Sequence, residues 1–178
     1  VSTEKSGKIS VEVVDVSGHG LAAAFLGTMV KLGFSVIDNE LPHKLFEVLN
    51  RILLPQLPMG RFITVCGLLF DPESGHIDFG RAGHPPALVL NAASKSISQL
   101  LGEGFPIGVM EDAEFSHEEI SLDHGDLISI FSDGVTEAQN RDMKYFGLDG
   151  ISASLQNLKE PYSAEDATET IYDSLEKF

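Results

Sequence analysis

Two stretches of the chain each place an aspartate at the end of an apolar run, with a glycine shortly after it. Residues 13–20 read VVDVSGHG, with a carboxylate at Asp15, and residues 128–138 read ISIFSDGVTEA, with a carboxylate at Asp133. A β-branched apolar run predicts a buried strand, and a glycine lets the backbone turn sharply or approach a ligand. If the fold brings the two carboxylates together, they form an oxygen-rich site for hard divalent cations.

Each aspartate also has an ordinary interpretation as a turn or cap residue. Asp15 precedes a glycine-rich turn and a predicted helix start, where short polar side chains commonly serve as caps. The same turn could instead bind an anion through its backbone N–H groups. Asp133 fits a simple turn after a strand, and Glu137 fits a charge in the first turn of a helix that complements the helix dipole.

The composition predicts one globular domain of ordinary size. The 178 residues are 43% hydrophobic, with a mean hydropathy of +0.06, which argues against disorder. The net charge of −15 opposes binding to nucleic acid or to an anionic membrane, because like charges repel. The plainest role of this charge is solubility. A chain this acidic that handles phosphate needs metal ions to offset the repulsion.

Two apolar features indicate core packing rather than chemistry or a membrane. The single cysteine, Cys66, excludes an intrachain disulfide, and its apolar surroundings predict a small buried hydrophobe. The longest apolar stretch, residues 21–37, is interrupted by Lys31 and is short for a membrane span, which needs about 20 residues. We expect this stretch to form a largely buried helix, and no signal peptide is visible.

The order of predicted elements is a strand, two helices, several strands and two helices, which favours an α+β fold. The two early helices, at 21–37 and 42–57, are joined by the short connection 38–41, so they should pack as antiparallel neighbours against a sheet. The side chains expected to be buried there are Leu26, Val30, Leu45, Leu49 and Ile52. The expected strands are 8–15, 62–71, 76–82, 87–91, 96–101, 114–122 and 126–132, and the late helices are 148–158 and 164–175.

Three motifs together resemble those of the bacterial branch of the metal-dependent PPM/PP2C protein phosphatases. They are residues 15–20 (DVSGHG), 82–86 (AGHPP) and 131–138 (FSDGVTEA), and the loop 104–108 (GFPIG) matches as well. More narrowly, nearly the whole chain resembles the stage II sporulation protein E and RsbU-like group. The resemblance implies an α-β-β-α sandwich of two antiparallel sheets flanked by helices. Residues 1–178 would form a single phosphatase domain that lacks terminal pieces at both ends.

The resemblance implies a serine/threonine phosphoprotein phosphatase that uses two Mn²⁺ or Mg²⁺ ions. In the family pattern Asp15 bridges both ions, the backbone carbonyl of Val16 binds one of them, and Asp133 binds the other. The two aspartates would therefore be the catalytic residues, with carboxylates close enough to share a metal cluster. Weaker candidates for a supporting or substrate-side role are Gly18, His19, Gly134 and Glu137. Two further acidic ligands of the family, in an upstream Gly-Gly-Asp motif and a late Asp-Asp motif, are expected outside residues 1–178.

The resemblance also implies a cytoplasmic protein with a particular kind of partner. Family substrates are often phosphorylated anti-anti-sigma proteins of the STAS type, in circuits with an anti-sigma kinase. Such domains usually follow an upstream sensor or receiver domain. Neither nucleic acid binding nor a membrane span in this chain is expected. A rival hypothesis is a non-catalytic regulatory module that keeps the phosphatase fold and binds an anti-sigma or STAS partner.

The remaining histidines and two arginines are assigned structural roles. His84 is expected to fix a loop between strands. Arg61 and Arg81 are expected to form surface ion pairs, with contact to a phosphoprotein as the alternative. Three histidines fall on strand edges or turns and show no metal-ligand spacing among themselves: His76, His117 and His124.

Overall fold

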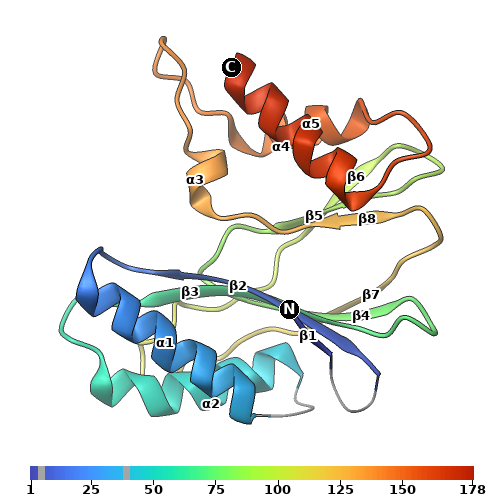
Figure 1. Cartoon of the computed structure of the whole chain (residues 1–178). Helices are drawn as coiled ribbons and strands as arrows, with labels where there is room; N and C mark the ends of the chain where they lie inside the picture. The colour runs from blue at the N-terminus through green and yellow to red at the C-terminus, as the bar shows by residue number, and fades with distance from the viewer. Residues whose placement is uncertain (4–6, 38–40) are drawn as a thin grey trace. The chain divides into compact units, whose positions relative to one another are not determined.

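The computed structural model describes residues 1–3, 7–37 and 41–178, and it divides into two compact units. The first unit comprises Val1–Pro86 and Leu100–Leu122, and the second comprises Ala87–Gln99 and Asp123–Phe178. Each unit has its own sheet and its own helices (Figure 1). Asp15 belongs to the first unit and Asp133 to the second.

The first unit is built on a five-stranded sheet in which every neighbouring pair of strands is antiparallel. Its strands, in sheet order, are β1 (Ser2–Thr3), β2 (Ile9–Val16), β3 (Ile63–Phe70), β4 (His76–Ala82) and β7 (Glu118–Ser121). The predictions for β2, β3 and β4 are confirmed to within a residue at each end. The strand predicted at 114–122 is shorter than expected, because only the stretch from Glu118 pairs with β4.

The register of β2 and β3 sends Asp15 to one face of the sheet and its neighbours to the other. Val14 lies opposite Val65 and Val16 opposite Ile63, and these side chains contribute to the hydrophobic core of the unit. Because successive side chains of a strand alternate between faces, Asp15 projects from the face opposite that core. It shares that face with Thr64, its partner across the ladder.

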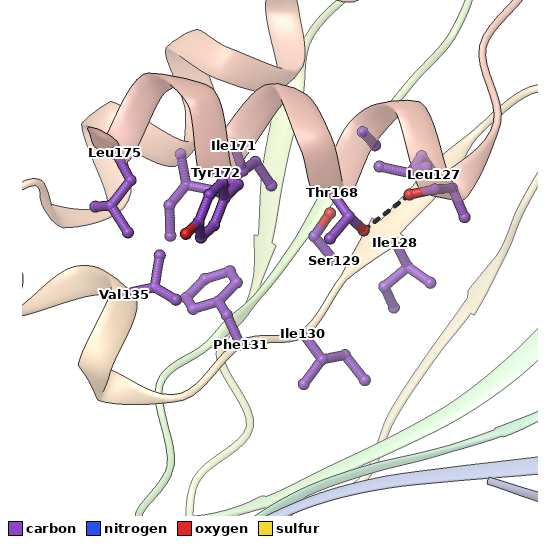
Figure 2. A pocket seen from close by; sticks show the side chains of 13 residues that line it. Leu127, Ile128, Ser129, Ile130, Phe131, Val135, Thr168, Ile171, Tyr172 and Leu175 are labelled. Atoms are coloured by element: carbon purple, nitrogen blue, oxygen red, sulfur yellow. Dashed lines mark hydrogen bonds between the residues drawn. The ribbon is translucent and has the colours of Figure 1, made fainter. Parts of the chain in front are cut away.

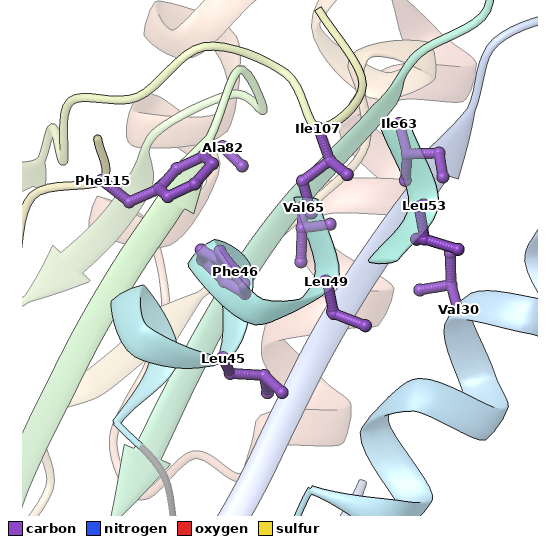
Figure 3. Close-up of a cluster of buried hydrophobic side chains, with 10 residues drawn as sticks. All are labelled: Val30, Leu45, Phe46, Leu49, Leu53, Ile63, Val65, Ala82, Ile107 and Phe115. Atoms are coloured by element: carbon purple, nitrogen blue, oxygen red, sulfur yellow. The ribbon is translucent and has the colours of Figure 1, made fainter. Parts of the chain in front are cut away.

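Two antiparallel helices, α1 (Leu21–Val36) and α2 (Pro42–Leu53), cover the core face of this sheet (Figure 1). The proline at the start of α2 suits a first helical turn, where its missing N–H is not needed. The helix passes into a short 3₁₀ turn, η1 (Leu54–Gln56). The connection predicted at 38–41 lies mostly outside the described residues. Figure 3 shows the buried cluster: Val30, Leu45, Phe46, Leu49, Leu53, Ile63, Val65, Ala82, Ile107 and Phe115.

Of the five side chains predicted to be buried on these helices, four are buried and one is not. Leu26, Val30, Leu45 and Leu49 are buried, whereas Ile52 is 53% exposed. The prediction for Ile52 was wrong because the stripe of α2 that contacts the sheet passes through Leu45, Leu49 and Leu53, which leaves Ile52 at its edge.

Helix α1 is less buried than its apolar composition predicts. Leu26 and Val30 are buried, whereas four large apolar side chains are mostly exposed: Leu21, Phe25, Leu32 and Val36. The prediction of a largely buried helix was therefore wrong. One stripe of α1 packs against the sheet and α2, and the remaining faces have no neighbouring element among the described residues. No helix in the described part of the chain is both long and apolar enough to cross a membrane.

Cys66 lies in the middle of β3 and is fully buried, as predicted for a small core hydrophobe. Burial disfavours the thiolate and raises the pKa of the Cys66 thiol to about 12. Since the thiolate is the nucleophilic form, this residue is chemically inert in the folded protein.

The second unit contains a three-stranded sheet and three helices. The strand order is β6 (Ile97–Leu100), β5 (Ala87–Leu90) and β8 (Leu127–Ser129), and β5 pairs with β8 in antiparallel register. The helices are α3 (Asp133–Thr136), α4 (Gly147–Gln156) and α5 (Ala164–Lys177). A capping box begins α5: the Ser163 side chain accepts from the Asp166 backbone N–H, and the Asp166 carboxylate accepts from the Ser163 backbone N–H.

An apolar cavity of about 380 Å³ lies between α5 and the segment that runs from β8 to α3 (Figure 2). Phe131, Val135 and Ile171 are among the side chains that line it. Thr168 also lines the cavity, and its hydroxyl donates a hydrogen bond to the Ala164 carbonyl at 2.9 Å. The polar atom of Thr168 is thus already satisfied within α5, and we interpret this cavity as incomplete packing beneath the helix.

Candidate functional site

Asp15 lies one residue before the end of β2, with its side chain exposed. Its carboxylate has no hydrogen bond or ion pair with any described residue. The strand places it opposite Thr64, whose hydroxyl lies 2.9 Å from Nδ1 of the buried His84. A rigid ladder and a buried hydrogen bond thus fix the backbone beneath a carboxylate that remains free to bind a ligand.

The turn after Asp15 is fastened to the start of β3. Arg61 donates from Nη1 to the Ser17 carbonyl at 2.9 Å. The Ser17 N–H donates to the Phe62 carbonyl at 3.0 Å, and the Phe62 N–H donates to Ser17 Oγ at 2.8 Å. Gly18 follows with φ of +95°, and a Cβ there would lie 1.5 Å from Arg61 Nη1. Only glycine therefore fits beneath the guanidinium group.

Gly18→Ala is expected to lower the free energy of unfolding by about 1–3 kcal/mol, because it strains the positive φ and displaces Arg61. Gly20→Ala is the matched control: its φ is also positive, +78°, but a Cβ there meets nothing within 4 Å. Urea unfolding of both variants should show the larger loss for Gly18→Ala, by about 0.5–1.5 kcal/mol for the displaced hydrogen bond. Equal losses would contradict the role given to Arg61.

With the residues that the structure describes, Arg61 and Arg81 form none of the surface ion pairs that were predicted for them. Arg81 donates from Nε to the Gly102 carbonyl at 2.9 Å and from Nη1 to the His84 carbonyl. Both arginines therefore use their charge to hold loop carbonyls next to the Asp15 face of the sheet. The prediction that His84 fixes the loop between strands agrees with its burial and its contact to Thr64.

Asp133 is the first residue of the short helix α3 and is exposed. The strand predicted at 126–132 ends at Ser129, so three further residues carry the chain from β8 to Asp133. The Asp133 carbonyl accepts from the Glu137 N–H at 2.7 Å, and its carboxylate has no partner among the described residues. Glu137 follows α3 instead of lying in its first turn, so the predicted dipole role is wrong.

The two predicted metal-binding aspartates, one in each unit, are thus both exposed and unpaired as far as the described residues extend. Val16 ends β2, and its side chain packs toward the core. Gly18 lies beneath Arg61, while Gly134 lies within α3 beside Asp133. His19 is exposed in the turn before α1 and has no side-chain partner in the described part of the chain. The shared metal cluster of Asp15 and Asp133 remains a prediction.

A second group of possible ligands was missed in the sequence. His76, Asp78 and Glu119 each offer a donor atom within 4.8 Å of the others, and His117 lies beside Asp78. The sequence prediction considered spacing among the histidines alone, whereas the structure places His76 beside two carboxylates. The patterns His76-x-Asp78 and His117-x-Glu119 place each pair on one face of a strand. This spacing is the feature of the sequence from which the cluster could have been predicted.

Solved structures that resemble this chain include PP2C phosphatase domains. The PP2C phosphatase domain of SpoIIE from Bacillus subtilis aligns with 94% of this chain and 50% of its own, with a TM-score of 0.71 and 18% identity. The catalytic domain of the serine/threonine protein phosphatase PstP, in complex with two manganese ions, has a TM-score of 0.66 and 15% identity, covering 94% and 81% of the two chains. The fold is therefore the PP2C fold that was predicted.

The chain belongs to the stage II sporulation protein E (SpoIIE) family, whose model matches residues 5–178. It is 28% identical over 174 residues to the phosphoserine phosphatase RsbU of Bacillus subtilis, covering 95% of this chain. The structure of the RsbU and RsbW domains of Rv1364c from Mycobacterium tuberculosis is 26% identical with a TM-score of 0.70, covering 96% of this chain. The chain spans half the length of RsbU and 47% of that solved chain.

Proposed function

We propose that this chain is a metal-dependent protein-serine/threonine phosphatase domain. The observation that supports this most directly is the state of the two family-motif aspartates: Asp15 and Asp133 each stand on an ordered element, and each carboxylate is exposed and has no partner among the described residues. A carboxylate that served only as a cap or a turn anchor would accept hydrogen bonds from nearby N–H groups. Both units together form the proposed domain, because the family model covers them continuously.

The proposed ligands fit manganese or magnesium. Asp15, the Val16 carbonyl and Asp133 offer oxygen atoms alone, the donor type that these hard ions prefer. The PstP catalytic domain, which shares the fold, is described with two manganese ions. When bound, two such ions supply an acidified water and offset the charge of a phosphoryl group.

Other residues of the chain would position the proposed metal ligands. The ladder from Asp15 to Thr64 and the Arg61 contact to the turn fix the backbone that carries the Asp15 carboxylate. Cys66 is buried and inert, so we do not assign it as a nucleophile. His19 and Glu137 remain candidates for contact with the substrate, since both side chains are exposed and each follows a proposed aspartate by four positions in the sequence.

The proposed substrate is a phosphorylated protein of the STAS anti-anti-sigma type, and the proposed setting is the cytoplasm. Support comes from the similarity to RsbU, named a phosphoserine phosphatase, and to a solved protein that contains both RsbU and RsbW domains. The chain matches half of RsbU, which leaves room in the relative for a further domain. We propose that an upstream sensor or receiver domain regulates the phosphatase.

The test is release of phosphate from a phosphoserine-bearing STAS protein by the whole encoded protein, with Mn²⁺ or Mg²⁺ titrated. Activity should rise with metal, stop on addition of a chelator, and return when metal is restored. A protein that binds the STAS partner but releases no phosphate at millimolar-order Mn²⁺ would instead be a non-catalytic regulatory module.

A further inference from the structure

A cluster of histidine and carboxylate side chains lies on the β4–β7 edge of the five-stranded sheet. His76 and Asp78 lie two positions apart in β4 and so share one face of the strand. Glu119 lies in β7 directly opposite Asp78. His117, two residues before Glu119, completes the group. Because residues two apart in a strand share a face, all four side chains gather on one side of this strand pair.

This cluster is separate from the site around Asp15. A Cβ on Gly80, two residues after Asp78, would lie 3.1 Å from Pro42 Cβ and 3.2 Å from the Phe46 ring. The cluster therefore shares the face of the sheet that α2 covers. Asp15 projects from the opposite face, so an ion held by the cluster cannot also be held by Asp15.

The donor atoms are close to the spacing that a small ion requires. His76 Nε2 lies 3.5 Å from Asp78 Oδ1, and His117 Nε2 lies 2.8 Å from the same oxygen. Glu119 offers a carboxylate oxygen within 4.8 Å of the ligand atoms of both His76 and Asp78. Ligands bound tetrahedrally at the usual zinc distances are about 3.3 Å apart, so small side-chain rotations would suffice to form a site.

The buried polar atoms in and around this cluster are not all paired by hydrogen bonds to described residues. Asp78 is 5% exposed, and a buried carboxylate is costly unless it is paired or binds a metal. His43, from the first turn of α2, stacks on His117 with ring centroids 4.6 Å apart. Its Nδ1 is buried without a hydrogen-bond partner in the described part of the chain. Buried polar atoms normally have a partner, so the polar groups beside the cluster are not fully satisfied by the described residues.

We propose that His76, Asp78 and Glu119 bind a zinc-type divalent ion, with His117 holding the Asp78 carboxylate in place. Imidazole and carboxylate donors together suit zinc and its neighbours in the first transition row better than they suit magnesium. The His76 and Glu119 side chains are 35% and 60% exposed, which gives the ion a route of entry. The ion would join the edge strand β7 to β4 and thereby stabilise the first unit.

The competing explanation is a cluster without metal, in which protonated histidines neutralise the carboxylates. That arrangement would bind no ion with defined stoichiometry. Zinc titration by calorimetry therefore separates the two explanations. The protein to use is the chain carrying Asp15→Asn and Asp133→Asn, so that the proposed phosphatase metals do not contribute and the result is independent of phosphatase activity.

One zinc ion per chain is expected to bind this background protein and raise its melting temperature. His76→Gln and Glu119→Gln should each weaken zinc binding at least about 100-fold, because each removes a ligand, and His117→Gln by about 10- to 100-fold. His124→Gln is the matched control, since His124 is exposed and lies in the second unit. It should leave zinc affinity unchanged.

The metal-free melting temperature of each variant verifies that the protein is folded before metal is added. Both ligand variants alter partly exposed side chains and leave the buried Asp78 in place, so they are expected to fold. Absence of stoichiometric zinc binding in the background protein would overturn the proposal. Unchanged affinity in His76→Gln and Glu119→Gln would overturn it as well.

Discussion

Asp15→Asn and Asp133→Asn are each expected to lower metal-dependent phosphate release by about two to three orders of magnitude, the size typical for loss of one group that stabilises the transition state. Each amide keeps the shape of the carboxylate but removes its negative charge. Affinity for a hard cation therefore falls, and the chemistry that the ion supplies is lost with it. The rate is to be measured on the whole encoded protein at a Mn²⁺ concentration that half-saturates the wild type.

Asp112→Asn is the matched control for these variants, because Asp112 is also an exposed aspartate of the first unit. It should retain the wild-type rate. All three proteins should melt within a degree or two of the wild type, since exposed substitutions away from buried networks cost little stability. A variant of Asp15 or Asp133 that kept more than about a tenth of the rate would remove that residue from the proposed catalytic pair.

Phe46→Ala is expected to lower the free energy of unfolding by about 3–5 kcal/mol, a large part of the stability of a typical domain. Phe46 is fully buried, and its ring meets that of Phe115 edge to face with centroids 5.9 Å apart. Gly67 and Gly80, neighbours across β3 and β4, leave the space that the ring fills. Neither glycine has a side chain that could move into the cavity that alanine would create.

The measurement is urea unfolding followed by circular dichroism, with Phe25→Ala as the control. Phe25 is an aromatic residue of α1 in the same unit but is 68% exposed. Its replacement should change the unfolding free energy by no more than about 0.5 kcal/mol. Comparable losses for the two variants would mean that the core does not depend on Phe46 in the way that its burial indicates.

The strands of the first unit could be predicted well because the signals that define them are local. Residues 62–71 and 76–82 are apolar runs bounded by turn residues, and both form strands at nearly the expected bounds. The strand predicted at 126–132 stops at Ser129, the last residue of β8 that pairs with β5. The length of β8 depends on its pairing with β5, about 40 residues earlier in the sequence, and a local sequence pattern contains no information about that pairing.

Burial of α1 and the role of the histidines depended on tertiary neighbours in the same way. The sequence of α1 is apolar on several faces, but composition does not say which faces another element will cover. The candidate aspartates were found because each motif is contiguous. The cluster around Asp78 joins β4 to β7, and its members become neighbours only when the register of that pair is known.

The ladder between β2 and β3 also sets where this chain can gain or lose residues over evolution. One residue inserted into β2 before Asp15 would reverse the alternation and direct its carboxylate into the core, unless a bulge absorbed the extra residue. The turn between β3 and β4 carries no such constraint, because its added residues would loop into solvent. Length variation in related chains should therefore accumulate at 72–75 and be nearly absent from 9–16.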